Sequence, residues 1–328
     1  MFDSVEKVEQ SLAEQEYICD QKIATVVYLA KILEKPVLVE GPAGVGKTEL
    51  AKSVAAATGR NLIRLQCYEG LDEAKALYEW EYSKQLLYTQ ILKERFAGLM
   101  EGTGSIREAA ERVGKEDSVS FSNNFIVPRP LMKAITAETP TLLLVDEVDK
   151  SDPEFEAFLL EVLSDFQVTV PELGTIHAIR KPLVFLTSNN AREMSDALKR
   201  RCLHLYIDYP SEELEKKILE TKVPDAAASL VQDVVGMMHR LRELDLKKTP
   251  SISETLDWAR ALLALNANEL DEDLVNQTFN VILKYEGDVR KAEGELSRLL
   301  EKKQAEAAAQ VPTSQAPSQA AVKKGALH

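Results

Sequence analysis

The sequence predicts an α/β domain, a parallel sheet covered by helices, followed by a small all-helical domain. Over residues 1–209, short apolar segments typical of buried strands alternate with helix-forming segments, and this order favours a parallel sheet with helices on both faces. Over residues 210–303 only helix-forming segments follow. Residues 304–328 are mostly Ala, Gln, Ser and Pro without apolar periodicity, so we expect a disordered tail.

The first domain is expected to contain five strands separated by helical segments. Residues 4–34 carry apolar side chains at three- and four-residue steps and are expected to be helical, and Pro36 marks the entry to the first strand. Residues 72–100 are mostly helix-forming, whereas 101–124 are rich in Gly, Ser and Asn. Short apolar runs predict strands at residues 37–39, 62–66, 142–145, 183–187 and 203–207.

The second domain is expected to contain only amphipathic helices, because its apolar residues recur at helical spacing. Pro210, Pro224 and Pro250 separate the segments, as helix-terminating residues do. The helices are predicted at residues 212–221, 225–244, 252–267, 271–285 and 288–303.

A complete phosphate-binding loop, G-P-A-G-V-G-K-T, follows the first strand and precedes a helix-forming segment, which is the context this motif requires. Its glycines permit backbone angles closed to other residues, so the loop amides can approach phosphate oxygens. Lys47 adds a charge for the β- and γ-phosphates, and the Thr48 hydroxyl can ligate Mg2+. The motif therefore predicts binding of ATP or GTP. The candidate nucleotide-binding residues are Gly41, Pro42, Ala43, Gly44, Val45, Gly46, Lys47, Thr48 and Glu49.

An apolar run that ends in two acids, L-L-L-V-D-E at residues 142–147, supplies groups that the loop lacks. In sites of this type an Asp on a second strand holds Mg2+, and Asp146 has that place here. Glu147 extends beyond the strand end, where a carboxylate could orient and deprotonate an attacking water. An acidic loop after a buried strand is the alternative, and the complete phosphate-binding loop disfavours it.

Two further polar segments are candidates for the same site. Asn189 follows a buried strand, where its amide could touch the γ-phosphate or the attacking water, although an ordinary Asn turn has the same spacing. Arg200 and Arg201 come some ten residues later. An Arg pair is usually a surface feature, but in a ring ATPase an arginine at this place stabilises transition-state charge in the neighbouring subunit's site.

Composition and charge disfavour several classes of protein. The 328 residues carry a net charge of −13, from 40 basic and 53 acidic side chains, and without a basic stripe we disfavour DNA or RNA as a substrate. No apolar run is long enough for a membrane span, and the N-terminus lacks a signal-peptide pattern, so a cytoplasmic protein is expected. Cys19, Cys67 and Cys202 are expected to be buried free thiols, and the four histidines form no motif, so no metal other than Mg2+ is expected.

The order of these motifs resembles that of the AAA+ ATPases and, within them, of the MoxR family. The resemblance covers roughly residues 10–300 and rests on G-P-A-G-V-G-K-T, L-L-L-V-D-E-V-D-K, L-T-S-N-N and S-D-A-L-K-R-R-C-L. The segments L-D-E-A-K-A-L-Y-E-W-E-Y-S-K-Q-L-L at 71–87 and S-I-S-E-T-L-D-W-A-R-A-L at 251–262 are most similar to the CoxD-type ATPases, which are associated with maturation of the molybdenum–copper carbon monoxide dehydrogenase.

The resemblance implies a P-loop NTPase (AAA+) fold with a helical lid domain. It places a helix 2 insertion at about 101–135 and a hairpin before sensor 1 at about 166–181. The phosphate-binding loop then corresponds to Walker A, and Asp146 with Glu147 to Walker B. Asn189 matches sensor 1, and Tyr17 and Ile18 are implied adenine contacts by analogy.

The resemblance also assigns the residues that would couple subunits and domains. Arg201 matches the arginine finger of the family, with Cys202 in place of a Phe, and Arg200 is the alternative. The position of the family's sensor 2 arginine is occupied by Ser253. Arg260, on the same predicted helix, is the candidate substitute. The coupling of the lid to ATP is therefore expected to differ from that of the family.

The function implied by the resemblance is that of a ring-forming homo-oligomer, hexameric by family habit, that hydrolyses ATP with Mg2+. Such a protein would remodel or activate a client metalloenzyme, with a molybdenum–copper carbon monoxide dehydrogenase as the candidate client. A von Willebrand factor A protein is the implied partner. Two alternatives remain: an AAA+ motor acting on nucleic acid, and an ATP-gated scaffold with little turnover.

Overall fold

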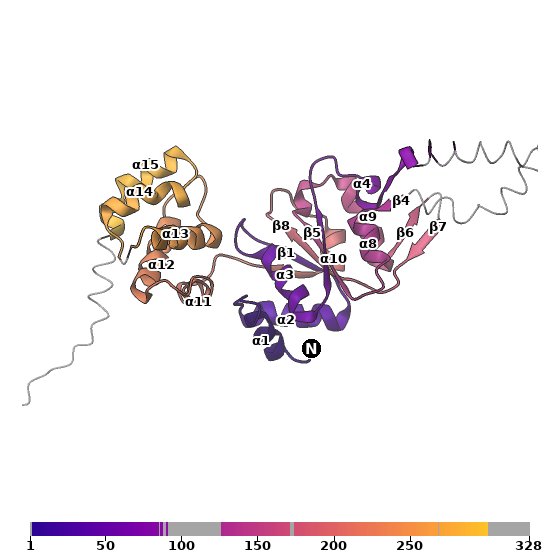
Figure 1. Ribbon diagram of the computed structural model, residues 1–328, viewed down its shortest axis with the longest axis horizontal. Helices are drawn as coiled ribbons and strands as arrows, with labels where there is room; N and C mark the ends of the chain where they lie inside the picture. The colour runs from indigo at the N-terminus through magenta and orange to yellow at the C-terminus, as the bar shows by residue number, and fades with distance from the viewer. Residues whose placement is uncertain are drawn as a thin grey trace, which may run out of the picture. The chain divides into compact units, whose positions relative to one another are not determined.

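The computed structural model describes residues 2–84, 86–87, 90, 126–170, 174–267 and 269–300. The chain divides into two compact units (Figure 1). The first comprises Met1–Lys222 and Ser251–Ser253, and the second comprises Val223–Pro250 and the described residues from Glu254 onward. The first unit extends beyond the expected boundary at residue 209 because it includes α11 (Glu212–Lys222).

The first unit is built on a five-stranded sheet in which every pair of neighbouring strands is parallel. The strand order is β2-β5-β8-β1-β9, so the strand before the phosphate-binding loop lies inside the sheet. The predicted α/β fold class is therefore confirmed. The strands are β1 (Val37–Glu40), β2 (Asn61–Gln66), β5 (Thr141–Asp146), β8 (Leu183–Ser188) and β9 (Leu203–Tyr206).

Helices cover both faces of this sheet (Figure 1). Successive strand residues point to opposite faces, so Val37 and Val39 pack in one apolar cluster and Leu38 packs in the other. The first cluster is formed with α1 (Val5–Ala13), α2 (Gln21–Leu33) and α3 (Lys47–Thr58). The second is formed with α4 (Glu73–Leu77), α8 (Pro130–Ile135), α9 (Pro153–Asp165) and α10 (Asp196–Arg201).

The helical stretch expected over residues 4–34 is two helices with a break between them. α1 ends at Ala13, and Glu16 adopts the left-handed conformation with φ 56°. Asp20 then caps α2, because its Oδ1 accepts a hydrogen bond of 2.8 Å from the Ile23 N–H. The apolar spacing continues through Tyr17 in the break and conceals it in the sequence.

Two small antiparallel pairs stand apart from the main sheet. β3 (Tyr78–Trp80) pairs with β4 (Ile126–Pro128), so the helix expected over 72–100 is wrong at residues 78–80. β6 (Gln167–Val170) pairs with β7 (Gly174–His177) inside the segment expected to form a hairpin. Residues 101–125, 171–173 and the tail at 304–328 lie outside the described residues.

The second unit is helical where the structure describes it, as the sequence predicts. Its core includes Trp258 and Phe279, both fully buried, and the Trp258 indole N–H donates to Thr278 Oγ1 at 2.9 Å. Asp288 accepts the backbone N–H groups of Lys247 and Lys248. The helices are α12 (Ala228–Arg242), α13 (Ile252–Ala264), α14 (Glu272–Ile282) and α15 (Glu286–Gly294).

The structure can be compared with two expectations from the sequence, which concern the state of the cysteines and the presence of membrane-spanning helices. Cys19, Cys67 and Cys202 are free and buried, as predicted, and burial raises the pKa of each thiol to about 12. A thiol with so high a pKa is a poor nucleophile at neutral pH. None of the helices in the described ranges has the length and apolar character needed to cross a membrane.

Candidate nucleotide-binding site

The candidate site lies at the carboxyl ends of the strands, where the phosphate-binding loop, the acid pair and Asn189 emerge. Because the strands are parallel, the loop after β1, the acids after β5 and the polar residues after β8 reach one edge of the sheet. Ligands of open α/β sheets bind at this edge. β2 ends at the same edge, with Gln66 paired in register with Asp146.

The loop has the backbone geometry that phosphate binding requires. Gly46 adopts φ 95° and caps α3, which begins at Lys47, so the positive end of that helix faces the loop. A Cβ at Gly41 would lie 1.9 Å from the Ile207 carbonyl oxygen, which excludes any other residue there without a backbone shift. Tyr17 lies beside the loop, because a Cβ at Gly46 would be 3.7 Å from its ring.

The Lys47 ammonium is buried and bonded to oxygen acceptors only. It donates to the carbonyl oxygens of Gly41 at 2.8 Å and Pro42 at 2.6 Å, and to Asn189 Oδ1 at 2.8 Å. Burial lowers the pKa of Lys47 to about 8, against the opposing effect of nearby Asp149, Asp146 and Glu147. An arriving polyphosphate would supply the negative charge that favours the protonated lysine.

Asp146 is 2% exposed and its carboxylate is saturated with hydrogen-bond donors. Thr48 Oγ1 donates to its Oδ1 at 3.0 Å, and Thr187 Oγ1 donates to the same oxygen. Arg64, from β2, donates to its Oδ2 through Nε at 2.9 Å and also through Nη2. Side chains from the phosphate-binding motif and from both strands that flank β5, β2 and β8, therefore meet at Asp146.

Glu147 has a strained backbone and a carboxylate held from several sides. Its φ of 57° is in the left-handed region, which non-glycine residues adopt mainly where function or packing demands it. The Glu147 N–H donates to Thr187 Oγ1 at 2.9 Å. Its carboxylate accepts from Asn189 Nδ2 at 3.3 Å and Gln66 Nε2 at 2.8 Å, and Lys150 Nζ lies 2.7 Å away.

Asn189 is positioned by a buried acid that the motifs did not single out. Asp149, in the 3-10 turn Val148–Lys150, accepts the backbone N–H of Asn189 at 3.1 Å and of Ala191 at 2.9 Å through its Oδ2. Asp149 is 5% exposed, and its Oδ1 is buried without a hydrogen-bond partner. The Asn189 amide thus bridges Lys47 and Glu147 from a fixed backbone.

The remaining predicted residues differ in their surroundings. Arg201 ends α10 and donates through Nε to Ser164 Oγ on α9 at 2.7 Å, while Arg200 is exposed. Ser253 donates to the Gly44 carbonyl at 3.3 Å. Arg260, in the second unit, lies 3.6 Å from Asp257 on the same helix. Ile18 is half-buried next to Tyr17.

The sequence reasoning missed four residues of the cluster: Arg64, Gln66, Asp149 and Thr187. Arg64 and Gln66 alternate on β2 with residues of the sheet interior, and polar side chains at the carboxyl end of a strand are the only signal that could have found them. Asp149 and Thr187 were quoted within the motifs, but the partners of a buried side chain depend on the fold and cannot be read from spacing.

The oxygen donors beside the loop fit Mg2+. Thr48 Oγ1 and Asp146 Oδ1 lie 3.0 Å apart, and Mg2+ is held by few protein oxygens together with water and substrate phosphates. No three His, Cys, Asp or Glu side chains of the described ranges form a metal cage. The unpartnered Asp149 Oδ1 adds a buried acceptor close to Lys47.

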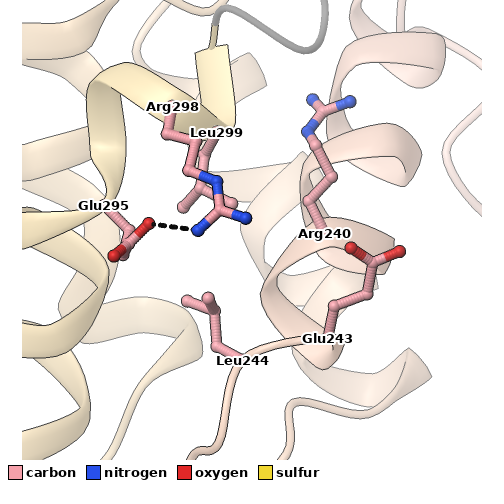
Figure 2. A pocket seen from close by; sticks show the side chains of 6 residues that line it. All are labelled: Arg240, Glu243, Leu244, Glu295, Arg298 and Leu299. Carbon is pink, nitrogen blue, oxygen red and sulfur yellow. Dashed lines mark hydrogen bonds and ion pairs between the residues drawn. The ribbon is translucent and has the colours of Figure 1, made fainter.

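A separate hollow of about 130 Å3 lies in the second unit. Figure 2 shows Arg298 and Glu295 turned toward each other, with 3.0 Å between Nη1 and Oε2. Two arginines and two glutamates balance one another there, and none of the predicted site residues is among those that line it: Arg240, Glu243, Leu244, Glu295, Arg298 and Leu299. The sheet edge therefore remains the candidate nucleotide site.

The chain is similar to several known proteins. It is 25% identical over 240 residues to an uncharacterized protein of Staphylococcus aureus, which covers 71% of this chain and 77% of the relative. For an uncharacterized protein of Staphylococcus haemolyticus the identity is 24% over 241 residues, with 71% and 78% covered. The Thermotoga maritima RuvB Holliday junction branch migration motor has a TM-score of 0.44 at 15% identity, with 83% of this chain and 69% of that chain covered.

One family model spans the loop, the two acids and Asn189. The model of the AAA domain, dynein-related subfamily, matches residues 36–202, which is half of the chain. The match begins just before β1 and ends after α10, so it includes the phosphate-binding loop, both acids and Asn189. The chain therefore belongs to the AAA domain family, in its dynein-related subfamily.

Proposed function

We propose that the chain hydrolyses ATP at the carboxyl edge of the sheet. The observation that carries the proposal is that Lys47 converges there with Asp146 and Glu147, which lie far from it in the sequence. Asn189 bonds both Lys47 and Glu147, and Thr48 bonds Asp146. A phosphate ligand, a metal ligand and a candidate base in one cluster are the parts that phosphoryl transfer to water needs.

Each residue has a definite part in this proposal. Lys47 and the loop amides bind the phosphates, and Thr48 and Asp146 would hold Mg2+, which neutralises developing charge on the phosphates. Glu147 accepts a proton from the attacking water at its carboxylate. Asn189, bonded to both Lys47 and Glu147, orients that water. Tyr17, which lies beside the loop, contributes with Ile18 to the wall against which the adenine packs.

The ATPase proposal is tested by Glu147→Gln, which keeps the shape of the side chain and removes its basicity. We expect ATP binding to be retained and the turnover number to fall by a factor on the order of 10² to 10⁴. Fluorescent-nucleotide binding and phosphate release measure the two quantities. Glu154→Gln, an exposed position on α9, is the matched control. Turnover by Glu147→Gln at the wild-type rate would remove Glu147 from the base role.

We further propose that the active form is a ring, hexameric by family habit, in which Arg201 completes the neighbouring subunit's site. In its own chain Arg201 contacts Ser164 and Ala197 and not the nucleotide cluster. When Arg201→Ala is mixed with wild-type protein, the ATPase activity should fall by more than the fraction of variant subunits in the mixture. Arg200→Ala should not cause such an excess loss. A proportional loss for Arg201→Ala would instead indicate a site complete within one subunit.

The finer proposal is that the ring remodels a client metalloenzyme together with a von Willebrand factor A partner. It rests on the resemblance to the MoxR family and its CoxD-type members. The net charge of −13 argues against a nucleic-acid motor. ATP-dependent co-elution of the Glu147→Gln variant with the partner protein tests it. Strong stimulation of ATPase activity by DNA or RNA would favour the motor instead.

A further inference from the structure

Arg64 occupies the carboxylate that the proposed function assigns to Mg2+. Its Nε lies 2.9 Å from Asp146 Oδ2, its Nη2 bonds the same oxygen, and Nη2 also bonds Gln66 Oε1. The Arg64 side chain is 49% exposed, whereas that of Asp146 is 2% exposed. A half-exposed cation thus covers one oxygen of a buried anion.

The hydrogen bonds of Asp146 leave no lone pair for another ligand. An ionised carboxylate offers about four acceptor sites, and four donors of this chain fill them. Thr48 and Thr187 donate to Oδ1, and Arg64 donates twice to Oδ2. Asp146 can therefore ligate Mg2+, or a water bound to it, only after one of these donors has moved.

Arg64 is the donor whose departure costs least. Thr187 is 1% exposed and also accepts the Glu147 N–H, so it cannot turn away without leaving a buried amide without a partner. Thr48 is itself an expected Mg2+ ligand. The Arg64 guanidinium can regain its hydrogen bonds from water, and it would be repelled by a divalent cation at Asp146.

We propose that Arg64 is the resident counter-ion of Asp146 and that it competes with Mg2+ for this carboxylate. The proposal rests on the proposed function, because it takes Asp146 as a Mg2+ ligand. Without the metal, Arg64 compensates the buried charge; with it, Arg64 must release Asp146. The Arg64 side chain thereby sets how much Mg2+ the site requires, and it is a positioning residue that the motif set does not contain.

The test is a titration of Mg2+ at a fixed concentration of fluorescent ADP, starting in EDTA, with nucleotide fluorescence as the readout. Arg64→Gln should lower the Mg2+ concentration for half saturation by on the order of tenfold, the effect of losing one charged hydrogen-bonded competitor. Arg64→Lys keeps the charge but cannot form the double hydrogen bond of the guanidinium. Its Mg2+ concentration for half saturation should lie between those of Arg64→Gln and the wild type. Arg60→Gln is the matched control, since Arg60 donates to the Thr141 carbonyl and not to the acids.

The outcomes separate this inference from the ATPase proposal. An unchanged or raised Mg2+ requirement in Arg64→Gln, with wild-type protein that responds to Mg2+, would overturn the competition. The same shift in Arg60→Gln would also overturn it, because general charge would then explain the effect. Wild-type protein whose ADP binding does not respond to Mg2+ would overturn the metal site itself.

Discussion

Thr187 at the end of β8 and Thr278 on α14 are both buried, and each hydroxyl acts both as a donor and as an acceptor of hydrogen bonds. Thr278 accepts from the Trp258 indole at 2.9 Å and donates to the Leu274 carbonyl at 2.7 Å. Thr187 accepts from the Glu147 amide at 2.9 Å and donates to Asp146. The same chemistry thus serves an apolar helical core in one unit and a charged cluster in the other.

The difference lies in what surrounds each hydroxyl. Around Thr278 the buried partners are neutral, so the bond only satisfies groups that folding has removed from water. Around Thr187 the partners are the two acids that the proposed chemistry uses, and one of them has a strained backbone. A buried polar group at the sheet edge fixes a functional side chain, whereas one in the second unit fixes only packing.

The largest expected effect is a loss of packing in the second unit. Phe279 is fully buried on α14, and truncating a buried aromatic costs about 3–5 kcal/mol. Phe279→Ala should therefore lower the free energy of unfolding of the second unit by that amount. The chain has two tryptophans, so Trp258 in a Trp80→Phe background reports this unit in a denaturant titration.

The reciprocal background supplies the control for this prediction. In a Trp258→Phe background, Trp80 reports the first unit, whose unfolding should not change on Phe279→Ala. Leu265→Ala, at a side chain 56% exposed, should change the stability of the second unit by less than about 0.5 kcal/mol. Equal losses from Phe279→Ala on both reporters would contradict the division into separate cores.

The fold was predictable where local pattern and tertiary packing agree. All five strands of the sheet appear where short apolar runs predicted them. The three inner strands β1, β5 and β8 are buried along their whole length and read as nearly continuous apolar segments, whereas the edge strands β2 and β9 include exposed polar residues. The break between α1 and α2 escaped prediction since Tyr17 continues the apolar spacing. β3 escaped because its partner β4 is some 46 residues later, and pairing at such separation leaves no local trace.

The site residues that belong to a sequence motif were predictable. The residues that the fold brings next to them from other segments were not. Lys47 and Asp146 are parts of motifs with a fixed chemical meaning. Arg64 reaches Asp146 only because β2 and β5 are neighbours in the sheet. Arg64 and Asp146 are 82 residues apart in the sequence, so spacing along the chain carries no information about the contact.

A matched pair of substitutions tests the comparison directly. Thr187→Val and Thr278→Val each remove one buried hydroxyl at nearly constant volume, and each should cost about 1–3 kcal/mol of stability because buried partners are left unsatisfied. Only Thr187→Val should also lower ATP turnover, by about tenfold, since losing the bond that fixes Glu147 costs about 1.4 kcal/mol at the transition state. Unfolding titrations and phosphate release measure both effects.

Serine variants complete this pair. Thr187→Ser keeps the hydroxyl and should recover most of the turnover. If the effect of Thr187→Val came from altered packing alone, the turnover of Thr187→Ser would remain low. Thr278→Ser should leave turnover as in the wild type. An equal loss of turnover in Thr278→Val and Thr187→Val, after correction for the fraction of unfolded protein, would contradict the distinction between the two regions.

The smallest expected effect is the pH dependence that burial of Lys47 brings to the sheet edge. Its pKa is lowered from 10.5 to about 8, so the folded protein binds fewer protons than the unfolded chain between these values. Without added nucleotide, the protein should therefore gain stability as the pH rises through this window. Nucleotide affinity should change in the opposite direction, because the phosphates favour the protonated lysine and raise its pKa.

From pH 7.5 to 8.5 the affinity for ADP should fall by about threefold, since a group with a pKa near 8 loses that fraction of its protonated form over this interval. Calorimetry in two buffers of different ionisation enthalpy should show uptake of a fraction of one proton on binding at pH 8.5. Lys47→Arg, whose guanidinium stays charged, should bind ADP with no such dependence. Wild-type binding without proton uptake at pH 8.5 would mean that Lys47 is already fully charged before the nucleotide binds, and that its three oxygen partners compensate its burial.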